Sequence, residues 1–168
     1  MGLFSKLFVK EETPKVETVK GGLYAPITGN YIPLEEIKDG VFSEGVLGPG
    51  CGIEPAEEIV VAPCNGTVST VAETKHAVGI TSDDGAELLI HVGLDTVDMN
   101  GDGFTVKVKV GQKVTCGQTL LTFSFAKIKA AGHPTTTAFL VTNADDVGAP
   151  ILETGKHFDK TEKFGQIG

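Results

Sequence analysis

Two histidines stand at the ends of two apolar runs that are joined by a short polar turn. In KHAVGITSDDGAELLIHVGLD, residues 75–95, His76 opens the first run and His91 closes the second. A neutral imidazole nitrogen can act as a nucleophile, and apolar surroundings favour the neutral ring because burial penalises its charged form. Thr74 precedes His76 by two residues, where its hydroxyl could fix the tautomer of that ring. This pattern indicates group transfer through a histidine.

The turn between the runs decides whether the two rings share a face. If residues 84–85 (Asp-Gly) are the centre of a two-residue hairpin turn, Val78 lies opposite His91, and His76 lies diagonal to His91 on the same face, roughly 5–8 Å away at Cβ. With residues 83–84 at the centre, His76 would face His91 directly. A three-residue loop would place the histidines on opposite faces. We therefore expect a two-residue turn and a shared face.

Other chemistries at these histidines are weaker or remain open. Two imidazoles supply half of a tetrahedral zinc shell, and no HxH, HExxH or cysteine pair completes it, which disfavours both a resident zinc ion and a zinc-dependent hydrolase of a related β fold. Zinc shared across an interface by His76 and His91 remains open. A lipoyl carrier would need a lysine at the hairpin tip, and residues 82–85 contain none. A regulatory protein-binding module is an open alternative.

Composition excludes several classes of function. The formal net charge is −8, and no basic stripe is present, so we expect no nucleic-acid partner. All 14 basic residues are lysines, so arginines for phosphate recognition must come from a partner. No GxxxxGK[ST] loop occurs, so a phosphate must come from another protein. Cys51, Cys64 and Cys116 form no CxxC pair and predict reduced, mostly buried thiols in a cytoplasmic protein.

Short β segments dominate from about residue 21. Residues 25–29 (APITG) and 62–66 (APCNG) form a weak repeat, which indicates two related halves. Residues 104–110 alternate strictly between apolar and polar side chains, as in a half-solvated antiparallel strand. Only residues 34–37 and 126–131 have a helical pattern, of about one turn each. The sequence predicts an all-β domain over residues 21–168, an antiparallel β-sandwich or squashed barrel with a duplicated motif.

The first 20 residues differ from the rest of the chain. Leu3, Phe4, Leu7 and Phe8 recur at helical spacing, which is typical of a short amphipathic helix and predicts weak contact of residues 1–10 with anionic membranes. The sixth residue is lysine, so the myristoylation pattern is not met. Residues 11–20 are charged, polar and contain proline, as linkers do. We expect residues 1–20 to be a flexible N-terminal segment.

The histidine segments resemble a known signature. Residues 73–77 (ETKHA) and 88–97 (LLIHVGLDTV) are similar to the active-site sequence of glucose-family enzyme IIA of the bacterial sugar phosphotransferase system. Residues 1–4, 23–29, 60–63 and 100–104 also have similar counterparts in that family. The resemblance covers about residues 20–145. After about Val147 the sequence departs from the family, and nothing can be transferred to that tail.

The resemblance implies a β-sandwich, a phosphohistidine at His91 and a supporting role for His76. It implies the phosphocarrier HPr as phosphoryl donor, the IIB domain of a glucose-type sugar permease as acceptor, and regulated target proteins as further partners. It identifies neither the sugar nor the targets. An apolar docking rim is implied at Phe42, Leu47, Leu89 and Val97. Acidic residues could meet basic residues of the partners, namely Asp39, Glu44 and Asp95.

Overall fold

The computed structural model describes residues 13–168, and the predicted contact of residues 1–10 with membranes lies outside this range. The described strands are β1 (Gly22–Tyr24), β2 (Gly29–Pro33), β3 (Gly50–Pro55), β4 (Ile59–Val61), β5 (Gly66–Val71), β6 (Ala77–Ser82), β7 (Glu87–His91), β8 (Phe104–Val106), β9 (Lys113–Val114), β10 (Thr119–Phe123), β11 (Thr137–Val141), β12 (Ile151–Leu152), β13 (Lys156–Phe158) and β14 (Lys163–Gln166). All their pairings are antiparallel.

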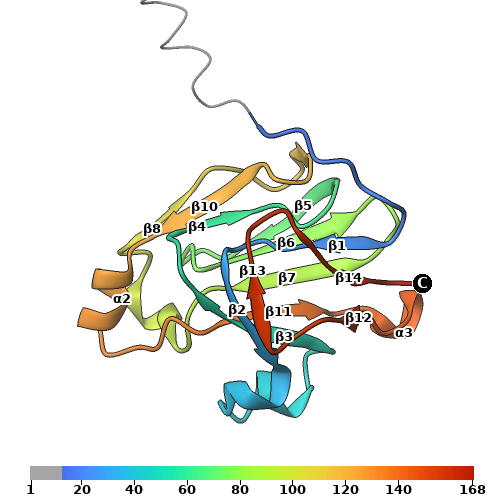
Figure 1. The fold of residues 1–168 in the computed structure, drawn as a ribbon. Helices are drawn as coiled ribbons and strands as arrows, with labels where there is room; N and C mark the ends of the chain where they lie inside the picture. The colour runs from blue at the N-terminus through green and yellow to red at the C-terminus, as the bar shows by residue number, and fades with distance from the viewer. Residues whose placement is uncertain (1–12) are drawn as a thin grey trace, which may run out of the picture.

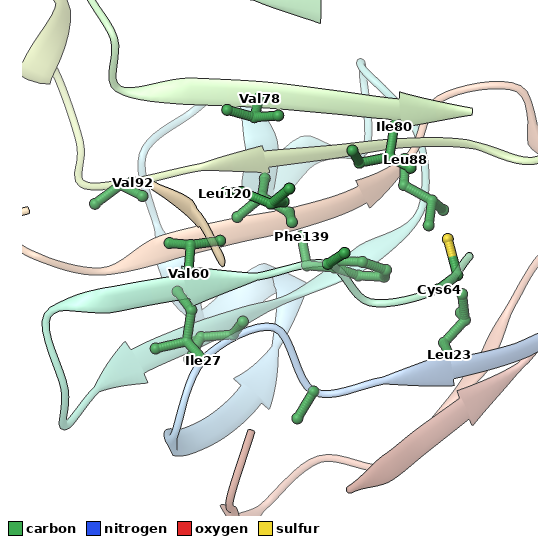
Figure 2. Close-up of a cluster of buried hydrophobic side chains, with 14 of the residues drawn as sticks. Leu23, Ile27, Val60, Cys64, Val78, Ile80, Leu88, Val92, Leu120 and Phe139 are labelled. Carbon is green, nitrogen blue, oxygen red and sulfur yellow. The ribbon is translucent and has the colours of Figure 1, made fainter. Parts of the chain in front are cut away.

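These strands form one large sheet and two small ones (Figure 1). The large sheet has the order β13-β2-β3-β11-β7-β6-β5-β9, and the small sheets have the orders β1-β14-β12 and β4-β10-β8. Side chains from both kinds of sheet meet in one core, where Val60 and Leu120 of a small sheet lie near Val78 and Phe139 of the large one (Figure 2). Burial of this apolar surface holds the layers together. The predicted β-sandwich is confirmed.

The strand order reveals an internal pseudo-twofold relationship. Read from either end, the large sheet passes through corresponding strands, β13 with β9, β2 with β5, β3 with β6, and β11 with β7. The two copies of the Ala-Pro repeat exchange equivalent hydrogen bonds, since Tyr24 N donates to Pro63 O (2.9 Å) and Val61 N donates to Pro26 O (2.8 Å). The predicted duplication is therefore built into the sheet.

Each repeat needs its glycine. Gly29 begins β2 and Gly66 begins β5, and a Cβ atom at either position would lie 2.3 Å from a backbone oxygen of the adjacent strand, that of Glu54 or Thr81. Contacts that short cannot be relieved by a side-chain rotation. The two glycines therefore allow equivalent close approaches of neighbouring strands in the two halves.

The tail after Val147 completes the half of the domain that contains β1, β2 and β3. β12, β13 and β14 pair as β8, β9 and β10 do, with β14 beside β1 and β13 beside β2. Gly155 N donates to Tyr31 O, as Gly111 N donates to Val68 O in the other half. Phe164 is fully buried and packs edge-on against Tyr31 and Phe139. The tail is thus an integral part of the sandwich.

Residues 13–20 lie along one edge of this domain. Pro14 and Val16 are close to Gly117. Thr18 Oγ1 accepts a hydrogen bond from Asn65 Nδ2 at 3.3 Å, and Gly21 N, just after this segment, donates to Asp84 at 2.9 Å. These contacts define the path by which the chain enters β1.

Two expectations about local structure need adjustment. The strand predicted over residues 104–110 ends at Val106. Val110 is 62% exposed and precedes a turn at Gly111, where φ is +90°. The two predicted helical turns are present as η1 (Leu34–Ile37) and α2 (Phe125–Ala130). Three further helical turns were not predicted, η2 (Phe42–Glu44), η3 (Thr96–Met99) and α3 (Ala144–Val147). No helix in residues 13–168 has the length and apolar character that crossing a bilayer requires.

Candidate active site

The hairpin that carries the histidines has a three-residue loop, so the predicted two-residue turn is wrong. Ala77, not Val78, lies opposite His91. The loop is closed by Ser82, whose N–H donates to Ala86 O and whose Oγ accepts from Ala86 N, and by Gly85 at a φ of +93°. A left-handed glycine at the third loop position is the usual ending of such loops, and an Asp-Gly pair serves this loop as well as the shorter one.

The two imidazoles nevertheless meet, with ring centroids 4.6 Å apart and planes at 81°. His76 precedes β6 and follows a tight turn in which Lys75 has a φ of +64° and its N–H donates to Ala72 O. Strand alternation therefore does not set the direction of the His76 side chain. The inference that a three-residue loop would separate the rings was wrong for this reason.

One nitrogen of His91 is assigned by its partner. Nδ1 lies 3.0 Å from the carbonyl oxygen of Gly93, and a carbonyl can only accept, so Nδ1 carries the proton. In the neutral ring Nε2 is then the unprotonated nitrogen. Burial, and next the nearby His76 ring, lower the pKa of His91 to about 4. His91 is therefore neutral, with a free Nε2, at physiological pH.

His76 is held by the threonine that the sequence singled out. The Thr74 hydroxyl lies 2.8 Å from Nδ1 of His76, and the imidazole is buried. Burial lowers the pKa of His76 below its ordinary value, although a hydrogen bond with the backbone of Thr74 opposes that shift. The structure thus brings Thr74, His76 and His91 together, as the sequence predicted for these three residues.

Phe42 also packs against His91. Its ring lies edge-to-face on the imidazole, with centroids 4.8 Å apart, and only 7% of Phe42 is exposed. Phe42 begins η2, and the carboxylate of Asp39 accepts hydrogen bonds from the N–H groups of Val41 (3.2 Å), Phe42 (3.1 Å) and Ser43 (2.9 Å). Burial raises the pKa of Asp39, but these hydrogen bonds outweigh it and hold the pKa below its usual value. No motif in the sequence predicted this loop cap.

A cleft of about 350 Å³ opens at His91, and its lining includes the predicted rim residues Phe42, Asp95 and Val97. Val97 is 51% exposed, and Leu47, at 44%, lies outside the lining of the cleft. Leu89 is half-buried and packs against a small cluster that contains Phe42. Three of the predicted rim residues, Phe42, Asp95 and Val97, thus line the cleft. Leu47 does not, and Leu89 packs against the cluster that contains Phe42.

No group of three or more histidine, cysteine or acidic side chains suited to hold a metal occurs within the described range. His76 and His91 present half of a tetrahedral zinc shell, so a shared zinc ion would need further ligands from a partner. The three cysteines are buried and free, and burial raises the pKa of Cys51 and Cys64 to about 12 and that of Cys116 to about 11. The thiols are therefore protonated and poor ligands.

A β-sandwich that presents a neutral histidine with one free nitrogen at a shallow cleft defines a group carrier that works through a histidine. Residues 21–147 match the family described as phosphoenolpyruvate-dependent sugar phosphotransferase system, EIIA 1, and the chain belongs to this family. The chain is accordingly a phosphoryl carrier of that system, a phosphotransferase component.

Its similarity extends to single-domain and multidomain relatives. It is 42% identical over 146 residues to the glucose-specific EIIA component of Oceanobacillus iheyensis, covering 86% of each chain. It is 51% identical over 135 residues to the beta-glucoside-specific EIIBCA component of Bacillus subtilis, covering 80% of this chain but 22% of that protein. Among solved structures, glucose permease IIA from Mycoplasma capricolum superposes with a TM-score of 0.75 at 32% identity, covering 86% of this chain and 93% of the other.

Proposed function

We propose that His91 is the residue that carries the phosphoryl group, accepting it from HPr and passing it to the IIB domain of a sugar permease. One observation carries this assignment. The Gly93 carbonyl holds the proton of His91 on Nδ1, which leaves the Nε2 lone pair available at the cleft. Burial keeps the ring neutral, as a nucleophile requires.

The transfer exchanges one bond for another. As Nε2 of His91 forms its bond to phosphorus, the bond between phosphorus and the phosphohistidine of HPr breaks, and that imidazole recovers the electron pair. In the second transfer the nucleophile of the IIB domain forms a bond to phosphorus, the bond between phosphorus and Nε2 breaks, and the His91 ring regains its lone pair. Such transfers depend on positioning and on charge stabilisation. Nδ1–H of His91 stays bonded to Gly93 throughout, which keeps the ring in place.

His76 stabilises the transferred group in this proposal. With the Thr74 hydroxyl donating to Nδ1, the other nitrogen of His76 carries a proton that can be donated to a phosphoryl oxygen. The ring centroids of His76 and His91 are 4.6 Å apart, which supports a role of His76 next to the proposed phosphoryl group. Losing this hydrogen bond would slow transfer without removing the nucleophile.

The rim around the cleft forms the docking surface in the proposal. Exposed apolar side chains give a flat contact area for either partner, and Asp39 and Asp95 at the cleft give it negative charge. This chain contains no arginine, so the partner must supply arginines to neutralise the phosphoryl oxygens, and the acidic pair would attract them. The proposed contacts are Phe42, Leu47, Leu89, Asp95 and Val97.

The sugar specificity of the acceptor has two candidates. The single-domain relatives are glucose-specific, whereas the beta-glucoside-specific relative is more similar in sequence, at 51% compared with 42% identity. Phosphorylated protein should be mixed with purified IIB domains of each type, and the initial rate of phosphoryl loss compared. The faster acceptor identifies the permease class.

Location and regulation complete the proposal. Three buried thiols without a disulfide suit a reducing compartment, so we place the protein in the cytoplasm. Regulated target proteins would contact the same rim, because phosphorylation changes its charge. Zinc shared between the two histidines and a target's carboxylate is compatible with the rim. Isothermal titration of a candidate target, with and without zinc and with and without phosphorylation, tests both ideas.

The experiment that tests the central assignment measures phosphate on the intact protein. The chain is incubated with enzyme I, HPr and phosphoenolpyruvate, and the added mass is determined by mass spectrometry. One phosphoryl group is expected, labile to acid and stable to base, as phosphohistidine is. Peptide mapping that places the phosphate on any residue other than His91 would contradict the proposal.

A further inference from the structure

A buried threonine lies directly beneath the active-site turn. Thr96 is fully buried, and its hydroxyl donates to the carbonyl oxygen of Val92 at 2.6 Å. Val92 separates His91 from Gly93, and the Val92 N–H is also bonded, to the carbonyl oxygen of His76 at 2.8 Å. Val92, the residue that follows the nucleophile, is therefore held at its N–H by the backbone of His76 and at its carbonyl by Thr96.

Thr96 constrains Gly93 in a second way. Gly93 has a φ of +77°, and a Cβ atom at this position would lie 2.4 Å from Cγ2 of Thr96 and 3.1 Å from the oxygen of Pro134. The Leu94 N–H donates to the same Pro134 oxygen at 3.2 Å. Glycine has wide backbone freedom, so its conformation here depends on these surroundings. The methyl group and the hydroxyl of Thr96 both contribute to them.

We propose that Thr96 is a positioning residue for phosphoryl transfer: its hydroxyl anchors the Val92–Gly93 turn so that the Gly93 carbonyl keeps the proton of His91 on Nδ1. The inference rests on the proposed role of His91. Without the hydroxyl, the buried Val92 carbonyl loses its partner, and rotation of the turn is the local way to recover one. The Gly93 carbonyl then leaves Nδ1, and the ring can hold its proton on Nε2, where it blocks attack.

The test compares Thr96→Val, which keeps the shape but lacks the hydroxyl, with Thr96→Ser, which keeps the hydroxyl. Thr137→Val is the matched control, because Thr137 is also fully buried and its hydroxyl also donates to a backbone carbonyl, that of Thr135. Its neighbour Ala138 pairs with His91, so Thr137 itself points to the other face of the sheet. All variants are made in the full chain.

Two quantities are measured, the tautomer of His91 by nitrogen-15 NMR and the rate of phosphoryl transfer from phospho-HPr. Thr96→Val should shift the neutral His91 ring from protonated Nδ1 toward protonated Nε2 and slow transfer about tenfold, the scale of one lost hydrogen bond. Thr96→Ser should restore the tautomer and most of the rate. Thr137→Val should lower the unfolding midpoint but leave the tautomer unchanged.

Two results would overturn the inference. Thr96→Val could keep the wild-type tautomer and rate, or Thr96→Val and Thr137→Val could slow transfer equally with unchanged tautomers, which would make the effect a general loss of stability. Failure of the proposed function looks different. In that case the wild-type protein carries its phosphate on a residue other than His91, and the tautomer measurement remains valid by itself.

Discussion

The ring of Phe42 lies edge-to-face on the imidazole of His91, with ring centroids 4.8 Å apart. Phe42 belongs to η2, whereas His76, whose ring centroid lies 4.6 Å from that of the same imidazole, belongs to the turn before β6. His91 is thus contacted by two segments that are far apart in sequence. These contacts contribute to the burial that lowers the pKa of His91.

The two histidines should respond differently to substitution. His91→Gln should abolish phosphate incorporation, because glutamine offers no nucleophilic ring nitrogen. His76→Gln should still accept one phosphate, with onward transfer to the IIB domain slowed about 10²–10³-fold, the range for loss of one transition-state hydrogen bond. Mass spectrometry and rapid-quench kinetics measure the two effects. The assignment of roles fails if His91→Gln takes up phosphate while His76→Gln takes up none.

Titration of His91 should reveal its enclosure. The ring should remain neutral down to a midpoint near pH 4, as followed by the imidazole proton shifts in NMR. Phe42→Ala should admit water and raise this midpoint toward the ordinary value of about 6.5, because burial is the main cause of the shift. Phe125→Ala is the control, because Phe125 is the first residue of α2 and its ring packs on Phe123, so the midpoint of His91 should be unchanged.

The same pKa shift has a consequence for stability. Between about pH 6.5 and pH 4 the unfolded chain protonates His91 while the folded protein does not, so this residue makes the free energy of unfolding fall as the pH falls through that window. His91→Gln should therefore lose less stability than the wild type between these pH values. Urea unfolding at a series of pH values measures the difference. Parallel losses in both proteins would contradict it.

The tail should be essential for stability. Phe164→Ala removes a fully buried ring that contacts Tyr31 and Phe139, so the free energy of unfolding should drop by about 3–5 kcal/mol. Ile151→Ala, on a side chain that is 79% exposed, should change it by less than about 0.5 kcal/mol. Urea denaturation followed by circular dichroism provides both values. Equal effects would show that the tail packs differently.

The N-terminal segment offers a separate test. Residues 1–10 should gain helicity when anionic vesicles are added, and Phe4→Glu should weaken the binding, because it places a charge on the apolar face of the predicted helix. Circular dichroism and vesicle sedimentation follow the two effects. Unchanged spectra on addition of vesicles would refute the prediction. Phosphoryl acceptance in solution should be equal with and without these residues.

The sequence predicted the site well where its residues are contiguous and poorly where they depend on loops. Thr74, His76 and His91 lie in two segments with specific signatures, which predicted that they share one site, and the three side chains do lie together. The three-residue hairpin loop was missed because residues 84–85 fit two turn types equally. The loop cap by Asp39 has no periodicity that would signal it, since it depends on three backbone N–H groups of an irregular segment.

The tail illustrates a different limit. Its strands are only two to four residues long, too short to show a period, and each is defined by a partner from a distant part of the chain. The duplication was predicted from one five-residue repeat, but the equivalence of β12–β14 with β8–β10 resides in backbone pairing and not in side-chain identity. The repeat in strand pairing therefore extends to the tail, whereas the repeat in sequence is limited to residues 25–29 and 62–66.

The pairing of Gly22 with Gln166 also determines when this protein can finish folding. During synthesis β1 emerges early, but its hydrogen-bonding partner β14 leaves the ribosome only with residues 163–166. The histidine pair and its turn come from residues 74–96, so they all precede β14 in the chain and are available before the sheet of β1, β14 and β12 can close. Because strand pairing between distant parts of a chain is slow, the pairing of β1 with β14 is expected to be a late step in the folding of this domain.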